Sequence, residues 1–204
     1  VPRNQQSVAL WDDAFTRTRI SYDRQWLDDN LGIWLHDFYG FDAVAILSDR
    51  DQPIYTMADG VSPAPTLLAD NWPAIAPLVS ELRSGLSGGA LRSRETGPSY
   101  PQVRDTILIG GIPAIVSVMP ILPQSESLEP ASGTEYLHIA IDYLDNAFAA
   151  KLEHDYGISG AIVSAGAEAG GGQGAYPLFD HNGKAVAFLA WQPGRPGVEL
   201  LQQI

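Results

Sequence analysis

Apolar side chains recur at helical spacing through the N-terminal part of the chain, where positions three and four apart share one helix face. The first stripe consists of Val8, Trp11, Phe15, Thr18 and Tyr22, and the second of Leu27, Leu31, Trp34, Leu35 and Phe38. Gly40 follows the second stripe, where a glycine ends a helix. The pattern predicts that the protein opens with a long helix that bends near Ser21.

Strand-like runs come next. The apolar run Ala43 to Leu47 predicts a buried strand, and the turn 48–51 joins it to a hairpin partner at 53–57. Further strands are expected at 105–109, 112–121 and 136–141, with Gly110-Gly111 as the turn between the first two. The C-terminal strands are expected at 158–164, 176–179 and 185–191, the last two joined by a turn at 181–184.

Two more stretches have helical spacing. In 66–83 the positions of Pro73 and Pro77 favour several short helices over one, and a loop rich in glycine and proline is expected over 84–102. The run 144–156 predicts a helix with Asp142 or Asp145 as its N-cap. The element order therefore predicts an α+β fold, in which a long N-terminal helix packs on one antiparallel sheet, with further helices and a C-terminal set of strands.

Composition and charge restrict the class of partner. The chain has 204 residues, 45% hydrophobic and 18% charged, which are values of a folded globular protein. Its formal charge of −12 repels nucleic acid and anionic membranes, so neither is expected as a partner. The absence of cysteine excludes disulfides and thiolate chemistry. The longest apolar run, 112–122, is interrupted by prolines and is shorter than the ~20 residues of a membrane-spanning helix.

Motifs of enzymes and metal sites lack the context they need. The G-x-S-x-G match at 85–89 follows a helical run instead of a strand, and the glycine run 170–174 has no lysine at Walker spacing. None of the four histidines has a partner at zinc-site spacing. Asp49 and Asp51 lack the glycine and glutamate of a calcium loop and are read as turn residues. We therefore expect no cofactor, no metal and no catalysis.

Several segments, taken in order, resemble the CHASE-type extracytoplasmic sensory domain of the fourth kind. They are Trp11 to Phe15, Trp26 to Leu31, Gly40 to Val44, Gly110 to Ala114, Met119 to Ile121, Phe179 to Lys184 and Ala190 to Gly197. The resemblance implies a PAS-like or Cache-like periplasmic sensor between two membrane helices of a bacterial receptor. It also implies a cytoplasmic output that makes or degrades cyclic-di-GMP, or a histidine kinase, and makes a homodimer plausible.

On this reading residues 1–204 form a single sensor domain. It comprises a helical segment (1–40), a PAS-like core (41–143), a helix with C-terminal strands (144–197) and the start of a link to the second membrane helix (198–204). Both ends of the chain are expected to continue into membrane helices. The expected partner is a small-molecule ligand.

The candidate ligand-binding residues are Trp11, Asp12, Phe15, Tyr55, His138 and Asp142. Trp11 and Phe15 either only pack the first helix on the sheet or line a cavity, and Asp12 is either solvated or directed at a ligand. Tyr55 shares a strand face with Met57, and His138 shares one with Asp142, although Asp142 also suits a helix cap. An acidic, aromatic pocket suits a cationic or polyhydroxylated ligand.

Ligand binding is expected to shift the population between two positions of the first helix on the sheet. Two other functions remain open. A periplasmic hydrolase could use Asp12-Asp13 or Asp28-Asp29, but adjacent helical acids cannot face one substrate from opposed positions. A protein-binding module would instead present a broad exposed apolar patch.

Overall fold

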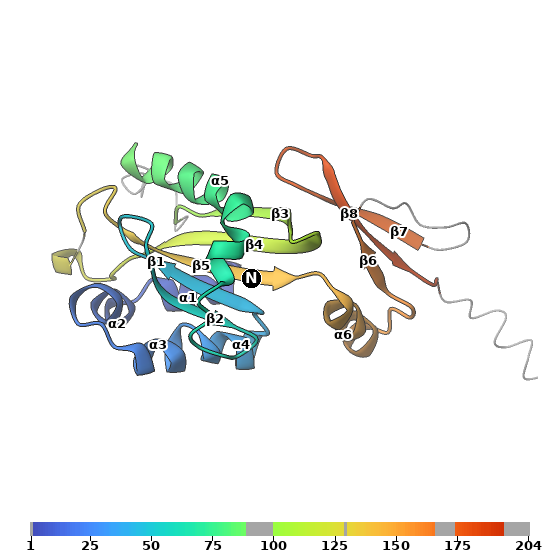
Figure 1. Ribbon diagram of the computed structural model, residues 1–204, viewed down its shortest axis with the longest axis horizontal. Coiled ribbons are helices and arrows are strands. Elements are labelled where there is room, and N and C mark those ends of the chain that lie inside the picture. Colours follow the sequence, from blue (N-terminus) through green and yellow to red (C-terminus); the bar gives the residue numbers. More distant parts are fainter. Residues whose placement is uncertain (1, 89–99, 129, 166–173, 194–204) are drawn as a thin grey trace, which may run out of the picture. The chain divides into compact units, whose positions relative to one another are not determined.

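The computed structural model describes residues 2–88, 100–128, 130–165 and 174–193, and the predicted α+β class is confirmed in Figure 1. The chain separates into two compact units. The first is Val1–Asp105 with Ile115–Asp142, and the second is Thr106–Ala114 with Tyr143–Ile204. Most of the predicted loop 84–102, most of the glycine-rich loop 166–174 and the segment 194–204 lie outside the described residues.

The main sheet has five antiparallel strands in the order β2-β1-β5-β4-β3. The strands are β1 (Ala43–Leu47), β2 (Pro53–Ala58), β3 (Val103–Ile109), β4 (Ile112–Ile121) and β5 (Tyr136–Tyr143). Both predicted hairpins are present, and Gly110 and Gly111 have the positive φ values of 58° and 86° that a tight turn requires. β1 lies between β2 and β5, and all five of its side chains are buried because helices cover both faces of the sheet.

The first helical segment is broken into pieces, so the prediction of one long helix is wrong. The pieces are α1 (Pro2–Ala9), α2 (Asp12–Phe15), a π-helical turn (Thr16–Ile20), α3 (Arg24–Asn30) and α4 (Ile33–Tyr39). Trp11 is extended, with φ −153° and ψ 135°, because Leu10 forms a bridge with Leu122. Asp23 breaks the helix again by accepting a hydrogen bond from the Trp26 N–H as an N-cap. Gly40 ends α4 at φ 72°, as predicted.

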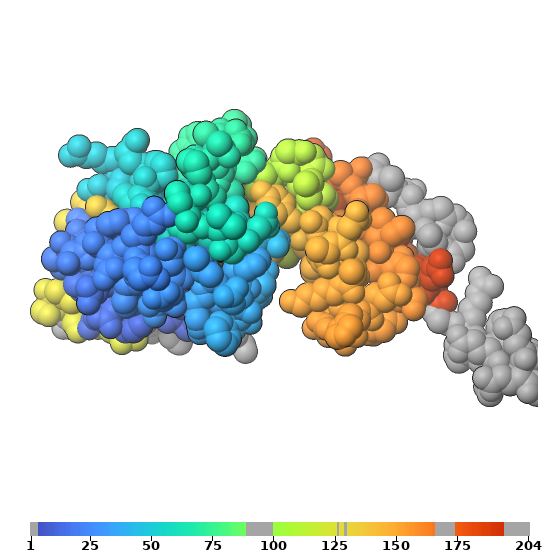
Figure 2. Space-filling view, turned by 60° about the horizontal axis from the view of Figure 1, so that its bottom comes forward, coloured from blue at the N-terminus to red at the C-terminus, as the bar shows by residue number. Residues whose placement is uncertain are grey.

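These helical pieces cover one face of the sheet, and Figure 2 shows their blue surface from outside. Their two apolar stripes pack on alternate residues of the strands, including Val44, Ile46 and Met57. Leu27, Leu31 and Leu35 are fully buried there. Most of each predicted stripe is thus confirmed as core, but the last residue of each, Tyr22 and Phe38, is exposed at 52% and 70%.

The opposite face of the sheet carries α5 (Leu67–Ser87), a single helix of 21 residues (Figure 1). The predicted division into short helices is wrong, even though Pro73 and Pro77 both lie inside α5. The two prolines are one turn apart and both exposed, so the carbonyls that lose their partners face water. The buried stripe of α5 holds the helix together; it consists of Leu67, Leu68, Ile75, Leu78, Val79, Leu82 and Leu86.

The second unit contains α6 (Asn146–Tyr156) and a three-stranded sheet in the order β6-β8-β7. Its strands are β6 (Ile162–Ser164), β7 (Gly174–Phe179) and β8 (Ala185–Trp191). Asp145 is the N-cap of α6, accepting from the N–H groups of Ala147 and Phe148, whereas Asp142 lies in β5. β6 is shorter than predicted because Gly160, at φ 64°, turns the chain just before it.

Arg83 of α5 connects three parts of the first unit. Its guanidinium donates to Asp51 Oδ1 at 2.9 and 3.0 Å and to the Ser48 carbonyl at 2.7 Å, both in the β1–β2 turn. It also donates to the Glu135 carbonyl at the start of β5. Asp51 has positive φ (56°), so the turn it occupies depends on such support.

We expect Arg83→Met to lower the free energy of unfolding by about 2–4 kcal/mol, since one ion pair and two carbonyl hydrogen bonds are lost in a partly buried site. Arg50→Met in the same turn is the control, because Arg50 is exposed, and it should change stability by less than about 0.5 kcal/mol. Urea unfolding of both variants measures the difference. Equal effects would contradict the role given to Arg83.

Candidate functional site

A cavity of 480 Å³ opens among the N-terminal helical pieces. We call it the tryptophan cavity; it is lined by Ser7, Val8, Trp11, Asn30, Trp34 and Gln124. These residues come from α1, the α1–α2 junction, the end of α3, the start of α4 and the segment after β4. The breaks that interrupt the first helix therefore create the cavity, because they let five chain segments meet at one place.

Both tryptophans are held by neighbouring rings. The Trp11 ring packs on Trp26, with 5.1 Å between centroids and 48° between planes. The Trp34 ring contacts Phe38 at 5.1 Å and Tyr39 at 5.3 Å. Such pairs add to the energy of burial and restrict ring rotation. The cavity thus has two aromatic walls in defined orientations.

Asp12 does not line the cavity, but it holds in place the segment that carries Gln124, one of the polar lining residues. Its Oδ1 accepts from the backbone N–H groups of Gln124 at 2.7 Å and Ser125 at 2.9 Å, and its Oδ2 accepts from the Ser125 hydroxyl. The Ser125 hydroxyl, followed by the backbone donors, lowers the pKa of Asp12 below its ordinary value. Asp12 consequently anchors the segment that brings Gln124 to the cavity.

The polar groups of the cavity are neutral amides and a hydroxyl. Asn30 Nδ2 donates to the Trp26 carbonyl at 2.9 Å, which fixes the orientation of the side chain and leaves its Oδ1 as an acceptor. Gln124 offers both a donor and an acceptor, and Ser7 lies on the opposite helix. Among the lining residues that the structure describes, none carries a formal charge.

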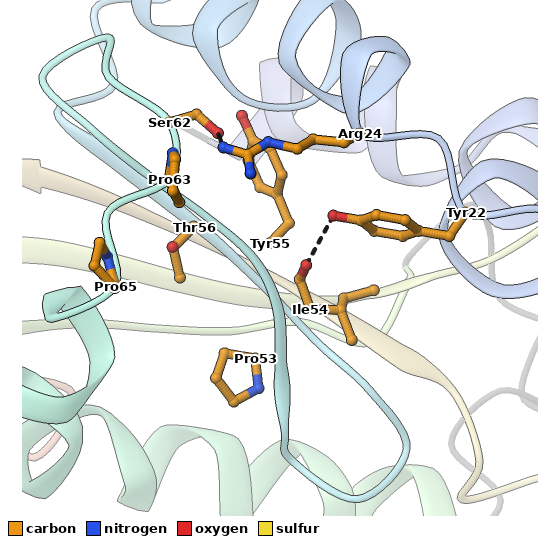
Figure 3. A pocket seen from close by; sticks show the side chains of 9 residues that line it. All are labelled: Tyr22, Arg24, Pro53, Ile54, Tyr55, Thr56, Ser62, Pro63 and Pro65. Atoms are coloured by element: carbon orange, nitrogen blue, oxygen red, sulfur yellow. Dashed lines mark hydrogen bonds between the residues drawn. The ribbon is translucent and has the colours of Figure 1, made fainter.

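A second cavity, of 250 Å³, lies along the outer edge of β2 (Figure 3). We call it the Arg24 cavity; it is lined by Tyr22, Arg24, Pro53, Ile54, Tyr55, Thr56, Ser62, Pro63 and Pro65. Tyr55 is only 4% exposed, and its hydroxyl donates to Asp28 Oδ1 at 2.7 Å. Burial raises the pKa of Tyr55, and the bond to Asp28 acts in the same direction.

Phe15 and His138 lie in the core. Phe15 is 6% exposed within the apolar cluster beneath the helices. His138 is fully buried in β5, with Nδ1 at 3.0 Å from Gln5 Nε2 and Nε2 at 3.2 Å from the Leu31 carbonyl. These partners suit the neutral ring with its proton on Nε2, and burial lowers the pKa of His138 to about 4.

The predicted site residues therefore do not meet in one pocket. Trp11 lines the tryptophan cavity and Tyr55 lines the Arg24 cavity, while Asp142 lies in β5 and lines neither of these two cavities. Their contact with a ligand stays a prediction. Sequence reasoning passed over Trp34 and Arg24, although Trp34 belongs to the second apolar stripe. No sequence signal indicates that Gln124 would lie near Trp11.

A model of the CHASE4 domain family matches residues 1–161, and the chain belongs to this family of extracytoplasmic sensory domains. The match covers the helical pieces, the main sheet and α6, and it confirms the resemblance drawn from the sequence. The family is sensory, not catalytic. A search of curated proteins finds no match for the chain. Within the described ranges, no helix is long and apolar enough to cross a membrane.

The buried state of His138 predicts how stability depends on pH. Its pKa is about 4 in the folded protein and 6.5 when unperturbed, so the unfolded chain takes up a proton at higher pH than the folded one. The stability contributed by neutral His138 is therefore complete above pH 6.5 and is lost as the pH falls toward 4, by about 3 kcal/mol at most.

The measurement is urea unfolding between pH 7.5 and 4.5 for the wild type, His138→Gln and His154→Gln. The His138 variant should have a shallower pH dependence, because the group that titrates is gone. His154 is exposed at the end of α6, and its variant should follow the wild type. Parallel curves for the wild type and His138→Gln would contradict the assignment.

Proposed function

We propose that this chain is the periplasmic ligand-sensing part of a bacterial membrane receptor, and that it binds a small, neutral, polyhydroxylated molecule in the tryptophan cavity. Membership of an extracytoplasmic sensory family supports the sensory role. The observation that carries the choice of ligand is the composition of the cavity wall, in which two ring-packed tryptophans face neutral amide and hydroxyl groups.

The chemistry of the wall supports a polyhydroxylated ligand over a cationic one, the two classes that the sequence left open. Each hydroxyl of a polyol both donates and accepts a hydrogen bond, and the Asn30 and Gln124 amides offer both roles. Aromatic faces bury the carbon skeleton of such a ligand. A cation could gain from the tryptophan faces, but the lining residues that are described provide no carboxylate to pair with it. Asp12 is already engaged with the Ser125 segment.

The way in which binding becomes a signal follows from what the ligand contacts. A ligand in the cavity touches α1, α3, α4 and the segment after β4 at once. Drawing these together favours one position of the helical pieces on the sheet, which is a population shift. We propose that flanking membrane helices carry this shift, in a homodimer, to a cyclic-di-GMP enzyme or histidine kinase.

One observation favours the alternative of a protein-binding module. Phe38 is 70% exposed and Tyr39 39% exposed, and both contact Trp34. The aromatic surface thus continues from the cavity rim onto the outside of α4. In a protein complex Phe38 would contribute to the interface, whereas a small ligand inside the cavity depends on Trp11 and Trp34.

Thermal unfolding against a panel of neutral sugars and polyols, with choline and small amines alongside, tests the proposal. A compound that binds only the folded state stabilises it by ~2.7 kcal/mol at one hundred times its dissociation constant. We expect a neutral polyol to raise the unfolding midpoint. Trp34→Ala and Trp11→Ala should abolish the shift with the fold retained.

Trp72→Ala is the matched control, because Trp72 belongs to α5 on the opposite face of the sheet, and it should keep the shift. Phe38→Ala should also keep it. A shift that survives Trp34→Ala would contradict the site, and a shift given only by amines would contradict the ligand class. If no compound raises the unfolding midpoint but Phe38→Ala abolishes the binding of a protein partner, the chain is a protein-binding module. Consumption of a compound would show an enzyme.

A further inference from the structure

We propose that the Arg24 cavity is a second, separate binding site, and that it takes a short-chain monocarboxylate. The two cavities share no lining residue. This inference does not depend on the sugar-binding role of the tryptophan cavity, since it rests on the charge and shape of different residues.

The charge of Arg24 is the first observation. Its guanidinium donates to the Ser62 hydroxyl at 3.2 Å, and no described carboxylate forms an ion pair with it. Arg17 and Arg83 of the same unit do form ion pairs, with Asp23 at 3.2 Å and Asp51 at 2.9 Å. In a chain with twice as many acidic as basic residues, an arginine left without a carboxylate on a cavity wall is available to a ligand.

The other walls of the cavity are mostly apolar. Pro53, Pro63 and Pro65 have no backbone N–H, and Ile54 and the Tyr55 ring complete the surface. Figure 3 shows Arg24 reaching across the cavity toward Ser62, with these residues around it. The cavity therefore combines one strong cationic donor with a surface suited to a short hydrocarbon chain.

The edge of β2 adds no competing acceptor. Two of its carbonyls already accept hydrogen bonds. The Ile54 carbonyl accepts from the Tyr22 hydroxyl at 3.0 Å, and the Thr56 carbonyl accepts from the Ala64 N–H at 3.2 Å. Asp28 does not line the cavity, and its Oδ1 accepts a hydrogen bond from the Tyr55 hydroxyl. An anion with acceptor oxygens complements this wall, whereas a cation would be repelled by Arg24.

The size of the cavity limits the ligand. Its volume of 250 Å³ is smaller than that of typical drug-binding pockets, which is ~300–1,000 Å³. Acetate, propionate and butyrate are of suitable size. The carboxylate would take the planar fork of Arg24, and the chain would lie on the prolines.

Calorimetric titration of the whole chain with acetate, propionate and butyrate tests the inference, with the corresponding amides as uncharged controls of matched shape. We expect saturable binding of at least one acid. The affinity of its amide should be lower by about tenfold or more, because a charge-assisted hydrogen bond is lost. Arg24→Gln should abolish binding, and Arg24→Lys should weaken it, because lysine keeps the charge but not the fork.

The variants are expected to fold, since Arg24 is exposed and its contact with Ser62 lies at the surface; thermal unfolding checks this. If Arg24→Gln does not fold, Arg24→Lys tests the role of Arg24, because it should bind the carboxylate more weakly than the wild type. Without added carboxylate, Arg24→Gln should keep the polyol-induced rise in the unfolding midpoint, so failure of this site and failure of the tryptophan cavity are distinguishable. Absence of binding, equal binding of acid and amide, binding that survives Arg24→Gln, or equal binding of inorganic phosphate would each overturn the proposal.

Discussion

The position of the first helix on the sheet depends on one buried side chain, the amide of Gln5. Gln5 is 0% exposed, and the two hydrogens of its Nε2 are shared among nearby acceptors that include the carbonyls of Ser117 in β4 and His138 in β5, at 3.2 and 3.0 Å. It also lies 3.0 Å from His138 Nδ1, while His138 Nε2 reaches the Leu31 carbonyl. Apolar contacts between helix and sheet are non-directional, so these directional hydrogen bonds determine the position of α1 along the strands.

Burial of the Gln5 amide also lowers the stability of the fold. Gln5 Oε1 and Ser117 Oγ are buried and have no hydrogen-bond partner among the residues described. Each such atom costs about 1–3 kcal/mol of stability. The hydrogen bonds of Gln5 therefore determine the position of α1 more than they stabilise the fold. Ser7 and Val8 lie in the same helix, one turn or less after Gln5, and line the tryptophan cavity. Any displacement of α1 along the sheet must therefore break the Gln5 hydrogen bonds.

The sequence predicted what depends on local periodicity and failed where distant contacts decide. Most of both apolar stripes, the three hairpins and the Gly40 helix end were predictable, because side-chain spacing and glycine geometry are local properties. The break at Trp11 was not, because it arises from the bridge between Leu10 and Leu122. For the site, the sequence left open whether Trp11 lines a cavity or only packs the core, and the structure places it at a cavity wall. Gln124 reaches this wall through Asp12, across more than a hundred residues.

The short junction between α3 and α4 is adjacent to both cavities. Asn30 and Trp34, on either side of it, line the tryptophan cavity, and Tyr55 of the Arg24 cavity packs on Gly32. That packing is tight: a Cβ on Gly32 would lie 1.8 Å from the Tyr55 hydroxyl. His138 holds the neighbouring Leu31 carbonyl, so the junction is also tied to the centre of the sheet. A ligand that displaces this junction from one cavity changes the affinity of the other, and linkage requires the effect to be equal in both directions.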